Sequence, residues 1–226
     1  MLLYYISMRE IKIAPNEYYH IFNRGMSKQK IFIDKRDWAR FLFLILHFQS
    51  PITFQNIGRP TKNFVKHSVF NIDKEQVTEI VENRFVELIS FCLMPNHFHL
   101  IIKEVEEGGI ASYMQRVLNS YTKYFNTKYK RSGHLFQGPY KAVHVEQNYQ
   151  LLHLSAYIHK NPTELAEWRN KISDYPWSSL QDFSTKNRWD NLIVPNIILE
   201  QFKTNGYQKF LETSTAKNVE HSVFNI

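Results

Sequence analysis

The chain has 226 residues, of which 43% are hydrophobic and 15% aromatic, so it can bury the core of one domain and still carry extensions. Its longest apolar run, residues 41–46, is far shorter than the roughly 20 residues of a membrane-spanning helix, so no membrane association is expected. The formal net charge of +7 favours a polyanionic partner such as nucleic acid over acidic proteins.

Hydrophobic periodicity and turn residues predict the secondary structure. In chain order, the expected elements are a strand at 17–23, a helix at 34–47, an irregular polar segment at 50–72, a helix at 73–83, strands at 85–93 and 97–103, a helix at 110–129, a strand at 140–145 and a helix at 147–160. The order β-α-β-β-α-β followed by a helix predicts a ferredoxin-like (RRM-like) α+β fold. We expect an antiparallel sheet with its helices packed on one face, which leaves the other face for a ligand.

Two histidines separated by one residue, His97 and His99, open the strand expected at 97–103. Side chains alternate along a strand, so both imidazoles face one side, roughly 6.6 Å apart, while Phe98 faces the core. Neutral imidazole is a common metal ligand, so the pair indicates half of a metal site, and local hydrogen bonding at a turn is the alternative. No Cys-x-x-Cys or His-Glu-x-x-His motif accompanies the pair, so neither structural zinc nor a zinc protease is supported.

Five short motifs occur in a fixed order between residues 94 and 179. They are residues 94–100 (MPNHFHL), 121–126 (YTKYFN), 133–138 (GHLFQG), 157–162 (YIHKNP) and 174–179 (DYPWSS). Together they resemble the HUH single-tyrosine transposases, and most closely the REP-associated tyrosine transposases. The resemblance runs from about residue 17 to residue 181. It implies a catalytic domain at 17–181 with an insertion at about 50–84, an N-terminal extension at 1–16 and a C-terminal extension at 182–226.

This resemblance implies a metal-dependent DNA endonuclease and strand transferase. His97 and His99 would bind a divalent ion, Mg²⁺ or Mn²⁺, and Tyr157 would attack a DNA phosphodiester to leave a 5′-phosphotyrosine and a free 3′-hydroxyl. A phenol with a pKa near 10 is a weak nucleophile unless a cation or base helps remove its proton, which agrees with this assignment. The expected partner is single-stranded or hairpin DNA, bound by a monomer or a homodimer. The single cysteine, Cys92, allows no internal disulfide and fits a bacterial cytoplasmic, nucleoid-associated location.

Asn161 lies four residues after Tyr157, about one helical turn away on the same face. It is the expected third metal ligand, although the wider transposase family carries glutamine at this offset, and a helix C-cap is the alternative role. Among the 13 tyrosines, Tyr121 and Tyr124 are the rival nucleophiles, but aromatic side chains at helical spacing usually pack in a core. His159 points away from Tyr157 around the helix, so we interpret it as structural or DNA-facing.

Basic residues form two groups in the sequence, one after the first strand and one at the end of the long helix. The expected DNA contacts are Arg24, Lys28, Lys123, Lys130, Arg131 and Lys141. For any single lysine a solvated surface position is the simpler interpretation, yet two basic groups beside one site suit a nucleic-acid path. Nearby aromatic rings could stack on unpaired bases.

Two other functions remain open at this point. A nucleic-acid-binding protein of the RRM type without catalysis would carry exposed aromatic residues on its central strands, in place of the two histidines. A phosphoesterase that uses water would usually need several carboxylates around its metal ion.

A separate feature is the hexapeptide HSVFNI, which occurs at residues 67–72 and again at 221–226. Its composition is strand-like, and a hypothesis is that both copies compete for, or extend, one sheet edge.

Overall fold

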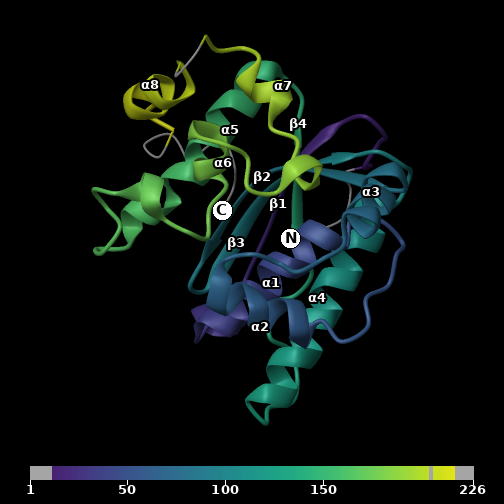
Figure 1. The fold of residues 1–226 in the computed structure, drawn as a ribbon. Coiled ribbons are helices and arrows are strands. Elements are labelled where there is room, and N and C mark those ends of the chain that lie inside the picture. Colours follow the sequence, from purple (N-terminus) through teal and green to yellow (C-terminus); the bar gives the residue numbers. More distant parts are fainter. Residues whose placement is uncertain (1–11, 204–205, 217–226) are drawn as a thin grey trace, which may run out of the picture.

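A computed structural model describes residues 12–203 and 206–216 of the chain (Figure 1). Its sheet consists of β1 (Tyr18–Arg24), β2 (Val86–Met94), β3 (His97–Glu104) and β4 (Lys141–Val145). These strands are antiparallel and lie in the order β2-β3-β1-β4. The eight α-helices of the described residues are α1 (Lys35–His47), α2 (Gly58–His67), α3 (Lys74–Glu82), α4 (Gly109–Lys128), α5 (Asn148–Lys160), α6 (Leu180–Ser184), α7 (Asn196–Leu199) and α8 (Gly206–Thr213).

The main core lies between one face of the sheet and the helices α1 and α4. Residues of the same parity on the central strands face it, such as Ile21 on β1 and Phe98 on β3, and both are fully buried. Asp34 caps α1 by accepting hydrogen bonds from the backbone of Arg36 and Asp37, which fixes where this helix begins. The sheet and the two helices behind it confirm the ferredoxin-like α+β fold that the sequence predicts.

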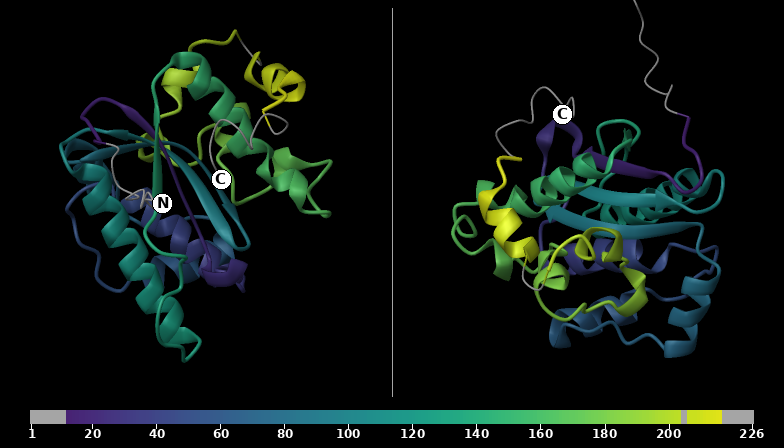
Figure 2. Two further views of the ribbon diagram at one scale, coloured as in Figure 1. Left: turned by 180° about the vertical axis from the view of Figure 1, so that it is seen from behind. Right: turned by 90° about the horizontal axis from the view of Figure 1, so that it is seen from above.

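The opposite face of the sheet is covered in part, and here one expectation was wrong. Helix α5 lies across this face, and Leu154 and Ile158 of α5 pack with Ile101 of β3 in a second hydrophobic cluster. The right view of Figure 2 shows the sheet between α5 on one side and α1 and α2 on the other. The helix after β4 therefore does not leave this face open, and a ligand can reach it only beside α5.

The segment that follows α5 extends the same cluster and covers the outer strand β2. The Val194 amide donates to the Leu88 carbonyl, and the Ser179 amide donates to the Phe91 carbonyl, at 2.9 and 3.0 Å. These bonds occupy backbone groups of an edge strand that would otherwise be open to pairing with another chain. The expected domain boundaries at residues 17 and 181 stay predictions, because packing does not define them.

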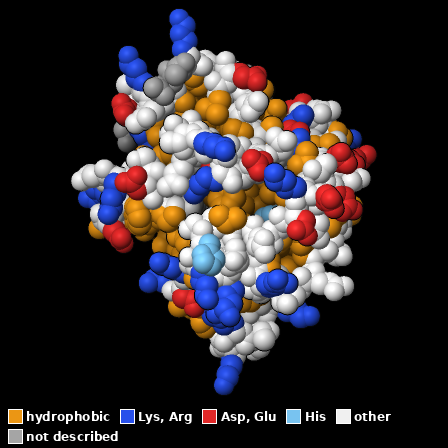
Figure 3. All heavy atoms as spheres, viewed as in Figure 1, with side chains coloured by type: hydrophobic (Ala, Val, Ile, Leu, Met, Phe, Trp, Pro, Cys, Tyr) orange, Lys and Arg blue, Asp and Glu red, His pale blue; other side chains and the backbone are white. Residues whose placement is uncertain are grey.

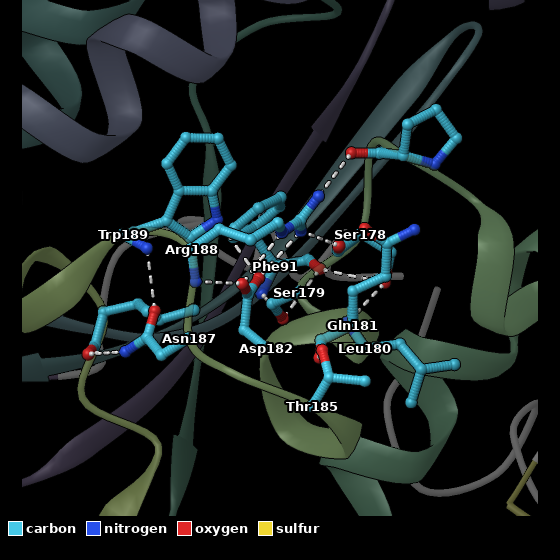
Figure 4. Close-up of polar contacts among 12 residues, drawn as sticks. Phe91, Ser178, Ser179, Leu180, Gln181, Asp182, Thr185, Asn187, Arg188 and Trp189 are labelled. Atoms are coloured by element: carbon cyan, nitrogen blue, oxygen red, sulfur yellow. Dashed lines mark hydrogen bonds and ion pairs between the residues drawn. The ribbon is translucent and has the colours of Figure 1, made fainter. Parts of the chain in front are cut away.

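Asp182 holds this segment together from a buried position (Figure 4). Its carboxylate accepts hydrogen bonds from the guanidinium and the backbone amide of Arg188, and from the indole N–H of Trp189 at 3.1 Å. Trp189 in turn packs in the main core, so the network joins the C-terminal segment to the sheet domain.

We expect the substitution Asp182→Ala to lower the free energy of unfolding by about 2–3 kcal/mol, because it leaves the indole and guanidinium donors without their buried acceptor. Urea denaturation followed by tryptophan fluorescence measures this loss. Asp190→Asn is the matched control, because Asp190 is exposed and its backbone has φ 48°, a conformation that asparagine also adopts. Equal stability of Asp182→Ala and the control would contradict the role given to the network.

The segment predicted to be irregular, residues 50–72, contains helix α2, which is a correction. Pro60 occupies the third position of α2, where a missing backbone N–H removes no helical hydrogen bond. The first HSVFNI copy is not a strand: His67 ends α2, and Phe70 packs against Phe64 with ring centroids 4.3 Å apart. The second copy, residues 221–226, lies outside the described residues.

Among the residues that the structure describes, no helix is long and apolar enough to span a membrane.

Candidate active site

The two histidines lie side by side on β3, on the face that α5 covers. Their ring centroids are 5.1 Å apart. His99 pairs across the sheet with Phe22 of β1 and Cys92 of β2, so it occupies the centre of the sheet, whereas His97 lies nearer the turn between β2 and β3. Strand alternation thus places both imidazoles on one face, as the sequence predicts.

Tyr157 lies on α5, over the part of the sheet that carries His99. Its ring centroid is 5.3 Å from that of His99, in an edge-to-face arrangement, and its side chain is 4% exposed. Residues 148–160 form a helix because apolar residues recur along the side that packs on the sheet, and this packing turns Tyr157 toward β3. The helix therefore brings a phenol to the two imidazoles from a position far away in the sequence.

Asn161 is the C-cap residue of α5. Its side-chain amide nitrogen forms a hydrogen bond, whereas its amide oxygen forms none within the described residues. The Nδ2 group donates to the Tyr157 carbonyl at 3.0 Å, while the buried Oδ1 atom has no hydrogen-bond partner among the described residues. A buried oxygen without a donor is costly, and a cation at this place would remove the cost. The capping position foreseen as an alternative is observed, and it leaves the amide oxygen available for a second role.

Hydrogen bonds fix how the two imidazoles are oriented. The Nδ1 atom of His97 donates to Asn96 Oδ1 at 2.7 Å, so the Nε2 atom carries the lone pair of the neutral ring. The Nδ1 atom of His99 lies 2.9 Å from Nε2 of His20, a fully buried residue of β1. Burial lowers the pKa of His20 to about 3, so this ring is neutral near pH 7. Such outer partners orient imidazoles in metal sites.

These side chains line one cavity of about 520 Å³. Of the residues predicted from the sequence, the cavity brings together His97, His99, Tyr157, Asn161, Arg24, Lys28 and Lys141. The other three expected DNA contacts do not line it: Lys123 lies on α4, and Lys130 and Arg131 follow the end of α4. The cavity is therefore electropositive along one side, where β1 and β4 reach its rim.

Among the lining or supporting residues that were missed in the sequence are His20, Asn96, Gln137 and Glu164. The position of His20 could have been recognised in the sequence, because side chains two residues apart on a strand share a face. His20 lies two residues before Phe22, the residue of β1 that pairs with His99. Gln137 accepts from Arg24 Nε at 2.6 Å across loops that no local pattern connects. Glu164 is the carboxylate of the cavity and lies in the 3-10 turn Asn161–Glu164 that ends the tyrosine helix.

The rival tyrosines lie in the main core on the far side of the sheet. The Tyr121 hydroxyl donates to the Ile31 carbonyl at 2.5 Å, and burial raises its pKa well above the usual range. The Tyr124 hydroxyl donates to Asp37, and burial raises its pKa to about 12. His159 is also structural: it is fully buried and bonded to Tyr207 and Ser179, which rules out the DNA-facing alternative.

The side chains of the cavity suit a divalent cation only if the Asn161 amide oxygen is one of the ligands. Within residues 12–203 and 206–216, no three His, Cys, Asp or Glu side chains are grouped closely enough to hold a metal ion. His97 and His99 supply two imidazoles, and the orphaned Asn161 oxygen lies in the same cavity. Imidazole nitrogen with neutral oxygen fits a divalent ion of the first transition row or magnesium with retained water.

Comparison with known proteins finds one matching family model and a solved structure with a similar fold. Residues 60–161 match the family model described as "Transposase IS200 like", a range that includes His97, His99, Tyr157 and Asn161. A solved structure described as "Structure of the REP associates tyrosine transposase bound to a REP hairpin" superposes with a TM-score of 0.51 at 12% identity, covering 78% of this chain and 84% of that chain. Comparison with the curated proteins gives no match.

A histidine pair on an antiparallel sheet beneath a tyrosine-bearing helix is the arrangement that the resemblance to the HUH single-tyrosine transposases implies, and the family model matches the part of the chain that carries it. Residues 60–161 are similar to the IS200-like transposases, and the chain shares the fold of the solved REP-associated transposase. The resemblance inferred from the five sequence motifs is thereby confirmed.

Proposed function

We propose that the chain is a metal-dependent endonuclease and strand transferase that acts on single-stranded DNA beside a hairpin. The observation that carries this proposal is the meeting of His97, His99, Tyr157 and Asn161 in one cavity whose rim is basic. DNA as the partner is supported by the hairpin-bound transposase that shares the fold. We propose the bacterial cytoplasm, on the nucleoid, as its location.

The Tyr157 hydroxyl is the proposed nucleophile. Its oxygen attacks the scissile phosphorus, the phenolic proton passes to solvent, and the bond from phosphorus to the 3′ oxygen breaks. The departing 3′ oxygen takes up a proton, and the 5′ phosphate stays on the tyrosine. The phosphotyrosine keeps the energy of the broken diester, so a 3′-hydroxyl can reverse the reaction and join strands without ATP.

His97, His99 and Asn161 would hold the divalent cation, Mg²⁺ or Mn²⁺, through two imidazole nitrogens and one amide oxygen. Such an ion, when bound, polarises a phosphate oxygen and stabilises the charge that develops on phosphoryl transfer. Arg24, Lys28 and Lys141 line the same cavity and would contact the phosphates on either side of the cut. Tyr157 is held by its helix, so the attacking oxygen needs little reorganisation.

We expect the wild-type chain to form a covalent complex with a labelled hairpin oligonucleotide in Mn²⁺, and Tyr157→Phe to form none, because phenylalanine keeps the ring but lacks the attacking oxygen. A denaturing gel that resolves labelled protein measures the result. Tyr149→Phe is the matched control, since Tyr149 lies on the same helix but is 57% exposed and lines no part of the cavity.

Two outcomes of this assay would point to other functions. Cleavage that persists in Tyr157→Phe would indicate water or another tyrosine as the nucleophile. DNA binding with no cleavage in any divalent metal would favour a binding protein without catalysis.

A further inference from the structure

A second cavity, of about 880 Å³, runs along the outer side of α4. One wall is a face of α4, and the other is the segment 134–140 that leads from α4 into β4. Gly138 and Pro139 line both this groove and the candidate active site, so the two hollows share a wall. A chain leaving the active site over these two residues would enter the groove.

The groove lies in a stretch of sequence without acidic residues. Residues 108–145 contain no Asp or Glu, although the whole chain has 21. The basic side chains of this stretch are Arg116, Lys123, Lys128, Lys130, Arg131 and Lys141. Two of them serve the fold, because Arg116 donates to the Ser50 carbonyl and Lys128 pairs with Asp34 and Asp37. The others are exposed. In the view of Figure 3, Lys and Arg side chains occur over the lower part of the molecule, down to the tip where α4 ends.

Most of the surface of the groove is apolar, and neutral polar side chains are set into it. Gln115 and Asn119 are exposed on successive turns of α4, above an apolar floor that includes Leu118 and Phe136. Asn126 donates from Nδ2 to the Gly133 carbonyl at 2.9 Å, while its buried Oδ1 has no hydrogen-bond partner among the described residues. Amides bond the edges of bases, and apolar surface takes their faces, so this chemistry suits unpaired bases better than a duplex backbone.

The wall shared with the active site is held rigidly. The backbone N–H of Gln137 donates to the backbone carbonyl of Arg24 at 2.8 Å. Asn23 Nδ2 donates to the backbone carbonyl of Gly138 at 3.1 Å. Gly138 has φ +74°, the left-handed conformation that lets the chain turn into β4 with no side chain between the two cavities. A preformed wall lowers the entropy cost of binding a flexible strand.

We propose that the groove between α4 and residues 134–140 binds the unpaired bases of the DNA strand that continues from the cleavage site. The occupant is single-stranded DNA, and this choice of polymer rests on the proposed function. Lys123, at the edge of the groove, contacts the strand's backbone, while Gln115 and Asn119 contact its bases. The groove thus makes affinity depend on the unpaired flank and not on the hairpin alone.

The double variant Gln115→Glu/Asn119→Asp tests this assignment, because it adds two carboxylates to the groove with almost no change of shape. Fluorescence anisotropy in EDTA, where no cleavage occurs, measures binding of a labelled random-sequence single strand of about 15 nucleotides. We expect affinity at least about tenfold weaker than that of the wild type, because the added charges repel the backbone. A bare hairpin with no flank should bind both proteins equally.

Gln76→Glu/Gln208→Glu is the matched control, since both residues are exposed helix positions outside the groove and the net charge changes equally. Thermal unfolding verifies that both double variants stay folded. Equal weakening in the two double variants would overturn the groove assignment, and so would no weakening in either. If only RNA of the same sequence responds to the groove substitutions, DNA as the occupant is wrong. None of these outcomes depends on Tyr157, so a failure of the proposed chemistry is measured separately.

Discussion

The substitution His99→Ala is expected to abolish both divalent-metal binding and DNA cleavage. His99 lies at the centre of the sheet, with its ring centroid 5.3 Å from that of Tyr157, and its loss leaves one imidazole and one amide, too few ligands for a bound ion. We expect Mn²⁺ affinity to fall by more than about 100-fold, beyond the effect of losing an outer partner. Titration followed by Mn²⁺ electron paramagnetic resonance measures binding without any reaction, and the gel assay measures cleavage.

His20 offers a graded version of the same test. His20→Leu removes the hydrogen bond to His99 Nδ1 and is expected to weaken Mn²⁺ binding about 10- to 100-fold, while His20→Gln keeps an acceptor and should bind more tightly than His20→Leu. His144→Ala is the control, because His144 lies on β4 and pairs with Glu17 outside the cavity. Normal metal binding and cleavage in His99→Ala would show that the proposed ligand set is wrong.

The chain is expected to lose about 4 kcal/mol of folding free energy between pH 7 and pH 5, from two buried histidines alone. Burial lowers the pKa of His47 to about 4 and of His159 to about 3, against about 6.5 when unfolded. Between these values the unfolded chain binds the protons and the folded chain does not. Stability is therefore fully present above pH 6.5 and falls as the pH drops toward the folded pKa values.

Urea denaturation at several pH values measures this dependence. A single non-titrating substitution, His159→Gln, should reduce the slope by about 1.4 kcal/mol per pH unit across the window, whatever it does to stability at pH 7. His134→Gln, at an exposed position, is the control for the substitution itself. Stability that stays constant from pH 7 to pH 5 would mean that both buried rings take up protons in the folded state.

The sheet and its main helices could be predicted because their signals are local. Alternation along 97–103 separates the histidine face from the face of Phe98, and the Asp34 cap marks the start of α1. The residues around Tyr157 were located by resemblance to a family, since nothing in the sequence itself brings residue 157 to residues 97 and 99. The structure supplies that juxtaposition through the packing of α5 on the sheet.

What could not be predicted depends on long-range packing or on an ambiguous residue. Pro60 suggests a break, yet at the third position of a helix it is tolerated, so α2 was missed. The partial covering of the second face depends on contacts between α5, β2 and the segment after residue 176, which no local periodicity encodes. The hydrogen bond between His20 and His99 joins the neighbouring strands β1 and β3, so it can be predicted only once the register of the sheet is known.

Mass spectrometry of the protein after reaction with a hairpin oligonucleotide tests the central claim most directly. Digestion of the covalent complex should yield one modified peptide, with the nucleotide 5′ phosphate joined to the oxygen of Tyr157. A nucleotide found on a different residue, or cleaved DNA with no nucleotide on the protein at all, would contradict the account.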